Sequence, residues 1–349
     1  MDAKQINSIS EFLLHAGTDY LIFDLGRRLS SLDSQTFLDI ENGTHIAPFP
    51  RQKHAWFGIV FWNKQASEQH YIWFVKLPLD EQGLVVAASR NHFLQIIVDA
   101  LGQSIAEDSD KHQTLPDNPY SFVPSQSQLA QFNAAVRQSL DLPISKSAEQ
   151  VIAYMKAPQV VDWQTIALQG IADIAARLGE NDRSEDIIEL TLQQFSSFAP
   201  SFQQSLMEMC ESVSLPPRVN NFMLDKIDID ETVNLAALRG VSQPQKDPSL
   251  ANKLSLLLQA GKMNRVDILS VIAARHFTQM DEPLIRAFFE AVAHLDNDEN
   301  YNGELFIGFF TDLVQVPSLR APMLAMLRAP DRSELLSRCI GKLFAHTKG

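Results

Sequence analysis

The stretch DPSLANKLSLLLQAGKMNRVDILSVIAARHFTQMDEPLIRAFFEAV, residues 247–292, contains regularly spaced helix-start signals. Asp247, Asn264 and Asp281 each precede an apolar run and stand 17 residues apart. Asp230 lies another 17 residues upstream. Short polar side chains of this kind accept hydrogen bonds from the free amides of a helix's first turn. We therefore expect each of the four to be a helix N-cap, so that two helices occupy 34 residues.

Apolar positions repeat with the same 34-residue period: Leu235 and Leu238 correspond to Leu269 and Ile272, and Leu250, Leu254 and Leu258 to Leu284, Phe288 and Val292. Such a period is typical of stacked helical hairpins, because one hairpin cannot bury its own apolar face. The tetratricopeptide pattern is absent, so we expect a solenoid that resembles HEAT repeats. The alternative is an irregular helical bundle whose caps happen to be evenly spaced.

The chain changes character near residue 103. Residues 1–102 predict an α+β domain with a small antiparallel sheet, and residues 126–349 predict an all-α helical-repeat domain. Between them, 103–125 is polar, rich in Pro, Asp and Ser, and lacks apolar periodicity, so it is predicted to be a linker. Further helices are expected at 126–139, 147–155, 161–178, 184–197, 200–213, 217–227, 300–315, 318–328 and 332–345.

The N-terminal region alternates helix and strand signals. The spacing of its apolar residues predicts helices at 6–16 and 34–41 and strands at 20–25, 55–62 and 70–77. RRLSSL, after the first strand, either extends it past a bulge or returns as a hairpin. Asp80 is expected to cap a helix that ends near Leu101, with Gly102 as its stop.

Both faces of the hairpin HAWFGIVFWNKQASEQHYIWFVKLPLD, residues 54–80, are apolar. Side chains alternate faces along a strand, so Phe57 and Ile59 point one way while Trp56 and Trp62 point the other. A strand that is apolar on both faces is normally covered on both. We expect the hairpin to be core, covered by the helices 6–16 and 81–101. Alternatively, one face docks a partner.

The composition is that of an ordinary globular protein, with 45% hydrophobic residues and a net charge of −13. Residues 103–349 carry most of the acidity. This charge argues against nucleic acid and anionic membrane as partners, and favours a basic protein. Two distant cysteines, Cys210 and Cys339, make no disulfide framework. Without a signal-peptide pattern or a long apolar run, we expect a cytoplasmic protein.

No stretch carries a strong signature of catalysis or of metal binding. LDNDENYNGELF, residues 295–306, suggests a calcium loop, but Tyr301 replaces the required glycine and Ile307 the bidentate glutamate. The Gly-Lys pairs of QAGKMN and CIGKLF lack the first glycine of a phosphate-binding loop. We therefore predict no catalytic residue, metal or cofactor.

The candidate binding residues are all in the N-terminal domain: Asp24, Arg27, Arg28, Trp56, Trp62, Asp80 and Glu81. In FDLGRR, residues 23–28, two arginines beside Asp24 suit an acidic group on a ligand or partner. The alternative is a local ion-paired turn. Asp80 and Glu81 are candidate acids, although capping also explains them.

FDLGRR, the two tryptophans of the first hairpin strand and IWFVKLPLDEQG, residues 72–83, resemble a gammaproteobacterial family of full-length domain-of-unknown-function proteins. The resemblance covers the whole chain. It implies a bacterial cytoplasmic protein and transfers no catalytic residue. The chain is thus predicted to be a non-enzymatic adaptor or regulator that binds a protein partner. The alternative is an enzyme whose site lies near Asp24, Arg27 and Asp80.

Overall fold

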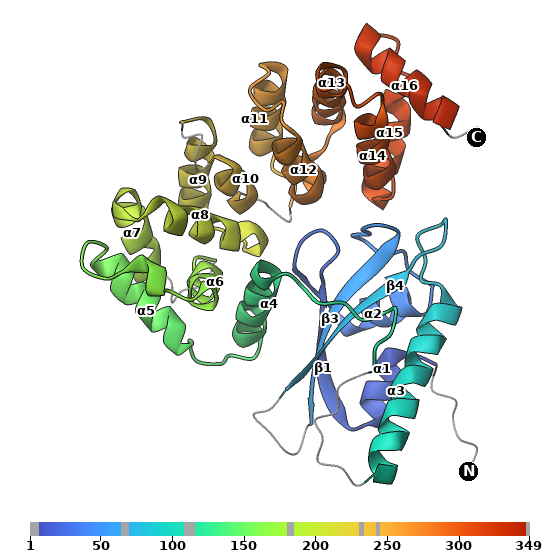
Figure 1. The fold of residues 1–349 in the computed structure, drawn as a ribbon, viewed down its shortest axis with the longest axis vertical. Helices are drawn as coiled ribbons and strands as arrows, with labels where there is room; N and C mark the ends of the chain where they lie inside the picture. The colour runs from blue at the N-terminus through green and yellow to red at the C-terminus, as the bar shows by residue number, and fades with distance from the viewer. Residues whose placement is uncertain are drawn as a thin grey trace. The chain divides into compact units, whose positions relative to one another are not determined.

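The structure, a computed structural model, describes residues 7–63, 70–107, 116–179, 185–229, 234–241 and 245–346. The chain forms two compact units, Met1–Ser125 and Gln126–Gly349 (Figure 1). The first unit combines a small antiparallel sheet with helices, and the described part of the second contains only helices and their connections. The predicted order of an α+β region followed by an all-α region is confirmed.

The first unit consists of α1 (Ile9–His15), β1 (Thr18–Asp24), β2 (Ser30–Leu32), α2 (Ser34–Glu41), β3 (His54–Asn63), β4 (Tyr71–Pro78) and α3 (Ala87–Glu107). Its four strands form one antiparallel sheet in the order β2-β1-β3-β4. RRLSSL therefore returns as a hairpin, since β2 pairs with β1.

One face of the sheet forms the core beneath the helices. The register places Ile22 of β1 opposite Ile59 of β3, and Ile59 opposite Trp73 of β4, so these side chains share a face. Figure 1 shows α1, α2 and α3 on the same side of the sheet. Buried side chains of the helices, such as Leu13 and Phe37, pack against this face. The prediction that the hairpin packs as core is confirmed here.

The other face of the sheet is covered in part by the segment after α3. The Lys76 amide donates to the Tyr120 carbonyl at 2.7 Å, and the Phe122 amide donates to the Phe74 carbonyl at 3.2 Å. The Phe122 ring then lies 4.8 Å from that of Trp56 and 5.7 Å from that of Phe74. Residues 120–122 therefore pair alongside β4, at the edge of the sheet, and shield the aromatic side chains of Trp56 and Phe74.

The predicted linker, 103–125, does not have one structure throughout. Residues up to Glu107 continue α3, 108–115 lie outside the described residues, and 120–122 pair with β4. The prediction that Gly102 stops the helix is wrong, because α3 runs through it. A glycine inside a helix costs about 1 kcal/mol, which the rest of a long helix can offset.

Asp80 does not cap a helix, so that prediction is also wrong. It opens a tight turn in which its Oδ1 accepts hydrogen bonds from the amides of Gln82 and Leu84, both at 2.9 Å. Gly83 supports the turn with a φ of 87°, a conformation that favours glycine. The chain reverses here, and α3 starts only at Ala87.

The second unit contains α4 (Gln126–Ser139), α5 (Lys146–Lys156), α6 (Leu168–Arg177), α7 (Glu185–Gln194), α8 (Pro200–Met209), α9 (Pro217–Ile229), α10 (Asn234–Gly240), α11 (Pro248–Gln259), α12 (Val266–Arg275), α13 (Glu282–Asp298), α14 (Glu304–Leu313), α15 (Pro317–Met326) and α16 (Glu334–His346). Short 3₁₀ helices include η3 (Cys210–Ser212) and η4 (Phe277–Gln279). Among the described residues, none of the helices is both long and apolar enough to cross a membrane.

These helices pack mainly on neighbours one or two places away along the chain. The even-numbered helices α4, α6, α8, α10 and α12 pack in that order, which we call the even row. The odd-numbered helices do the same from α5 to α9, and again from α11 to α15. Figure 1 shows successive helices of this unit lying side by side in chain order.

The four predicted N-caps have different outcomes. Asp247 and Asp281 cap α11 and α13, where their side chains accept from the amides of Leu250 and Leu284 at 3.3 and 3.0 Å. The prediction for Asn264 is wrong, since α12 starts two residues later and its cap is Arg265. Asp230 lies outside the described residues.

Candidate functional site

Asp24 is the best placed of the predicted binding residues, at the buried end of β1. Only 1% of Asp24 is exposed, and its Oδ1 accepts a hydrogen bond from the Gly26 amide at 2.7 Å. Gly26 is required sterically, because a Cβ there would lie 1.9 Å from the Phe49 carbonyl oxygen. The strand end and residues 49–51 are thus pressed together without room for a side chain at Gly26.

Two arginines and a tryptophan complete this cluster. Arg27 is buried, and its Nε donates to the Pro50 carbonyl at 3.0 Å. Trp56 Nε1 donates to the Arg51 carbonyl at 2.9 Å, and the Arg51 guanidinium lies 4.0 Å from the centre of the Trp56 ring. This distance suits a cation–π contact. The structure therefore brings together Asp24, Arg27 and Trp56, and adds Arg51, which the sequence did not single out.

Burial controls the charge of Asp24. It raises the pKa of the carboxyl to about 7, although the Gly26 amide and the charges of Arg51 and Arg27 oppose the rise. A carboxyl that titrates near neutrality could exchange protons. Asp24 is enclosed by the fold, however, so its geometry suits a structural contact better than a contact with substrate.

The remaining predicted residues do not join this cluster. Arg28 is half-buried in the turn before β2. Trp62 is half-buried six residues beyond Trp56, which places it about 20 Å away along β3. Asp80 and Glu81 are exposed in their own turn, where the Asp80 carboxylate binds backbone amides of that turn.

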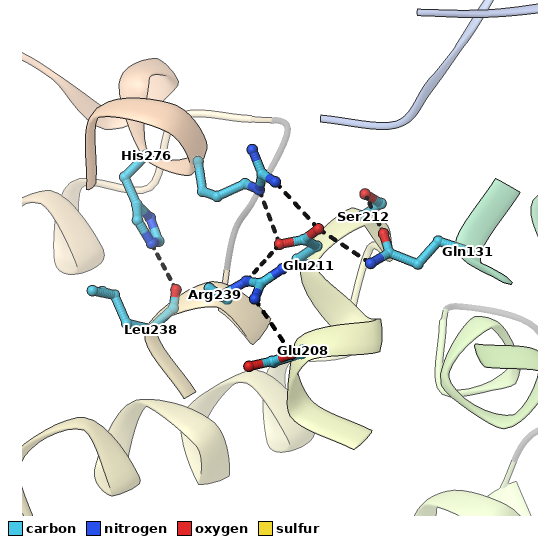
Figure 2. A network of polar contacts seen from close by, with 8 residues as sticks. Gln131, Glu208, Glu211, Ser212, Leu238, Arg239 and His276 are labelled. Atoms are coloured by element: carbon cyan, nitrogen blue, oxygen red, sulfur yellow. Dashed lines mark hydrogen bonds and ion pairs between the residues drawn. The ribbon is translucent and has the colours of Figure 1, made fainter. Parts of the chain in front are cut away.

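Glu211 of η3 is the centre of a polar network in the second unit (Figure 2). Arg239 Nε and Arg275 Nε each donate to Glu211 Oε2 at 2.9 Å. Gln131 Nε2 donates to Glu211 Oε1 at 3.1 Å and its own Oε1 accepts from Ser212 at 3.2 Å. These side chains come from α4, η3, α10 and α12, so one carboxylate connects three helices of the even row.

The network keeps Glu211 ionised. Burial disfavours its charge, but Arg275 and Arg239 outweigh burial and lower the pKa of Glu211 to about 2. Arg239 also lies 3.3 Å from Glu208 of α8. Close by, His276 Nε2 donates to the Leu238 carbonyl at 2.7 Å and ties the end of α12 to α10. The Glu211 side chain is 8% exposed, which fits a structural clamp rather than a binding site.

The even row is interrupted after α12. Helices α12 and α14 each pack on α13, but they share no extensive packing with each other, and both are described over their whole length. A groove with a volume of about 390 Å³ lies between them. Its lining, which we call the α12/α14 groove, is Val266, Ser270, Ala273, Ala274, Glu304, Leu305, Gly308, Phe309 and Asp312.

The groove has an apolar interior and acidic side chains. Its exposed lining surface is mostly apolar, and Glu304 and Asp312 are its charged members. Gly308 contributes no side chain to the lining, and a Cβ at this exposed position would meet no atom within 4 Å. The Phe309 ring packs against the ring of Phe288 of α13, with ring centres 5.4 Å apart. Such a surface suits a ligand that is apolar with basic flanks.

Sequence reasoning missed the Glu211 network and the groove. Gln131 and Glu211 are 80 residues apart, and no local pattern links them. One local signal did exist for the groove, namely Gly308 within the apolar run ELFIGFF of a predicted helix. A glycine there either weakens the helix or leaves space for a close approach.

No metal site is formed by the parts of the chain that the structure describes, where no three His, Cys, Asp or Glu side chains gather to hold an ion. The calcium-like stretch instead supplies a helix contact. Asp296 of α13 is buried, and its carboxylate accepts from the amides of Gly303 and Phe306 at 2.6 and 3.2 Å. It thereby satisfies amides at the start of α14.

Fold and site together define a protein with an α+β unit, an array of helices and an apolar groove in that array. The chain belongs to a family described as protein of unknown function (DUF3549), whose profile matches residues 4–344. The resemblance carried by FDLGRR and the tryptophan hairpin is thus confirmed at the level of the family and over nearly the whole chain. No curated protein and no solved structure matches it.

Proposed function

We propose that the protein is a non-enzymatic adaptor or regulator that binds a protein partner through its helical unit. The observation that carries the proposal is the α12/α14 groove, where the packing of the even row stops and leaves apolar side chains open to solvent. Apolar surface of this kind is stabilised when a partner covers it. A volume of about 390 Å³ suits several side chains of a docked segment.

The proposal includes the HEAT-like solenoid as the scaffold of the groove. Packing between alternate helices, together with the 34-residue period, supports this arrangement. The cytoplasm of a gammaproteobacterial cell is the proposed compartment. Two distant, buried free cysteines suit a reducing environment.

A photo-cross-linking residue introduced at Ser270, which is exposed on the groove, tests the function in living cells of the source organism. We expect a covalent adduct with one protein, identified by mass spectrometry. The adduct should disappear when Gly308→Gln fills the groove. The Cβ of this glutamine would meet no atom within 4 Å.

Gly341→Gln is the matched control. Gly341 is also an exposed glycine within a helix, α16, with open space at its Cβ position. The adduct should form as in the parent protein. An adduct that is indifferent to Gly308→Gln, or no adduct from Ser270, would overturn the proposed function.

A further inference from the structure

The α12/α14 groove runs lengthwise between two helices. On α12 its lining residues Val266, Ser270 and Ala273 are spaced by four and three positions, which places them in one stripe along the helix. On α14 Glu304, Gly308 and Asp312 are spaced by four positions and form a second stripe. A groove bounded by two such stripes accepts an elongated segment that lies along both helices.

Small residues in the groove allow a helix backbone to come close. Ala273 and Ala274 line one side, and Gly308 lies opposite on α14. Distances between packed helices depend on the size of the side chains at the contact, and small ones permit the shortest approach. A helix in this place would supply the neighbour that α12 and α14 lack in the even row.

The charge of the groove is one-sided. Its lining contains Glu304 and Asp312 and no lysine, arginine or histidine. Glu304 lies in the first turn of α14, at one end of the groove. A basic side chain at the matching end of a docked helix would meet it.

We propose that the occupant of the groove is a basic amphipathic helix of the partner. Its apolar side chains pack on Val266, Leu305 and Phe309, and a Lys or Arg side chain pairs with Glu304. This is the helix-in-groove mode of recognition. The inference rests on the proposed function and adds the chemistry of the partner's segment.

Two dye-labelled model helices of about 14 residues, long enough to lie along α12 and α14, test the inference by fluorescence anisotropy. One is built from Leu and Lys, the other from Leu and Glu in the same pattern. At physiological salt, the full-length protein should bind the Leu–Lys helix at least about tenfold more tightly than the Leu–Glu helix. Gly308→Gln and Glu304→Lys should each weaken Leu–Lys binding by about tenfold.

Two matched variants separate groove binding from general attraction to an acidic protein. Glu149→Lys changes the net charge as Glu304→Lys does, and both residues are exposed in the first turn of a helix. Gly341→Gln matches Gly308→Gln. Both should bind the Leu–Lys helix within about twofold of the parent. Equal losses in variant and control, or equal binding of the two helices, would overturn the inference.

The cross-linking experiment distinguishes this failure from failure of the proposed function. If Ser270 captures a partner in a Gly308-dependent way but the cross-linked segment is acidic or not helical, the basic-helix inference fails and the adaptor function stands. If no groove-dependent adduct forms, the function itself fails, whatever the model helices do.

Discussion

At the scale of single residues, two buried carboxylates respond to opposite surroundings. Asp24 has a backbone amide as its hydrogen-bond donor and a raised pKa. Glu211 receives three hydrogen bonds from two arginines, and its pKa is lowered. Burial disfavours the charge of both, and each has two arginines nearby, so the direct hydrogen bonds from Arg239 and Arg275 keep Glu211 ionised.

Asp24 should make the stability of the protein fall as pH rises towards neutrality. Its pKa is about 7 in the folded protein against an ordinary value of 3.8, so between these values the folded state binds a proton that the unfolded state has lost. The free energy of unfolding therefore decreases from about pH 4 to about pH 7 and then levels off. Asp24→Asn keeps an acceptor for the Gly26 amide and should remove this decrease.

Melting temperatures measured by circular dichroism across this pH range provide the check. Asp99→Asn, which removes an exposed carboxylate from α3, is the control and should keep the pH dependence of the parent. If Asp24→Asn showed the same decrease as the parent, the buried carboxyl would not be its origin.

Glu211→Ala should cost about 3–5 kcal/mol of unfolding free energy, because it leaves Arg239 and Arg275 without their shared buried partner. Urea denaturation measures the loss. Glu185→Ala is the comparison, since Glu185 pairs with Arg218 at 2.6 Å but is 69% exposed. It should cost less than about 1 kcal/mol. Similar costs for the two variants would contradict the clamp role of Glu211.

The clamp also has a pH dependence of the opposite sign. The pKa of Glu211 is lowered from 4.5 to about 2, so its stabilisation is fully present above the ordinary value. The stabilisation is lost as pH falls through about 2, where the folded state is protonated as well.

At the scale of elements, some helix and strand bounds follow from local sequence patterns and others do not. Ser34–Glu41 has the bounds that the sequence predicted, and β3 and β4 differ from theirs by only one residue at each end. Alternation of apolar residues and a capping Asp33 are local properties, so a short stretch of sequence contains them. Asn264 and Asp80 have the side chains of helix caps, but no helix begins directly after either of them. α12 starts at Val266, and Asp80 is followed by a tight turn before α3 starts at Ala87.

The caps can be ranked by substitution. Asp247→Ala and Asp281→Ala should each cost about 1 kcal/mol, since each leaves first-turn amides unsatisfied. Asn264→Ala should cost less than about 0.5 kcal/mol, because Asn264 Oδ1 is buried without a hydrogen-bond partner. Chemical denaturation of the three variants tests the order. A cost for Asn264→Ala equal to that of Asp281→Ala would place the start of α12 at Asn264.

At the scale of the whole molecule, the chain divides at Ser125 because contacts are concentrated on either side of it. The first unit has its own core of sheet and helices, and the second consists of helices packed on near neighbours. Each unit thus has the burial that an independently folding domain needs. The polar composition of 103–125 correctly indicated a change of architecture, but not that its last residues pair with β4.

Fragments of the first unit test the role of this segment. A fragment of residues 1–125 should be more stable than one of residues 1–115. Only the longer fragment contains Tyr120 and Phe122, which pair with the edge of β4 and shield Trp56. Thermal unfolding followed by tryptophan fluorescence compares them. Equal melting temperatures would mean that residues 116–125 contribute nothing to the unit.

The sequence by itself determined the order of the elements, the division into an α+β and an all-α region, and the family to which the chain belongs. Periodicity, turn residues and caps act over a few positions, so they can be read directly from the chain. Only the tertiary structure brought Arg51 beside Trp56, joined Gln131 to Glu211 and left α12 and α14 without extensive packing on each other. These features depend on which distant segments meet, and that is decided by the packing of whole helices and strands rather than by any local pattern.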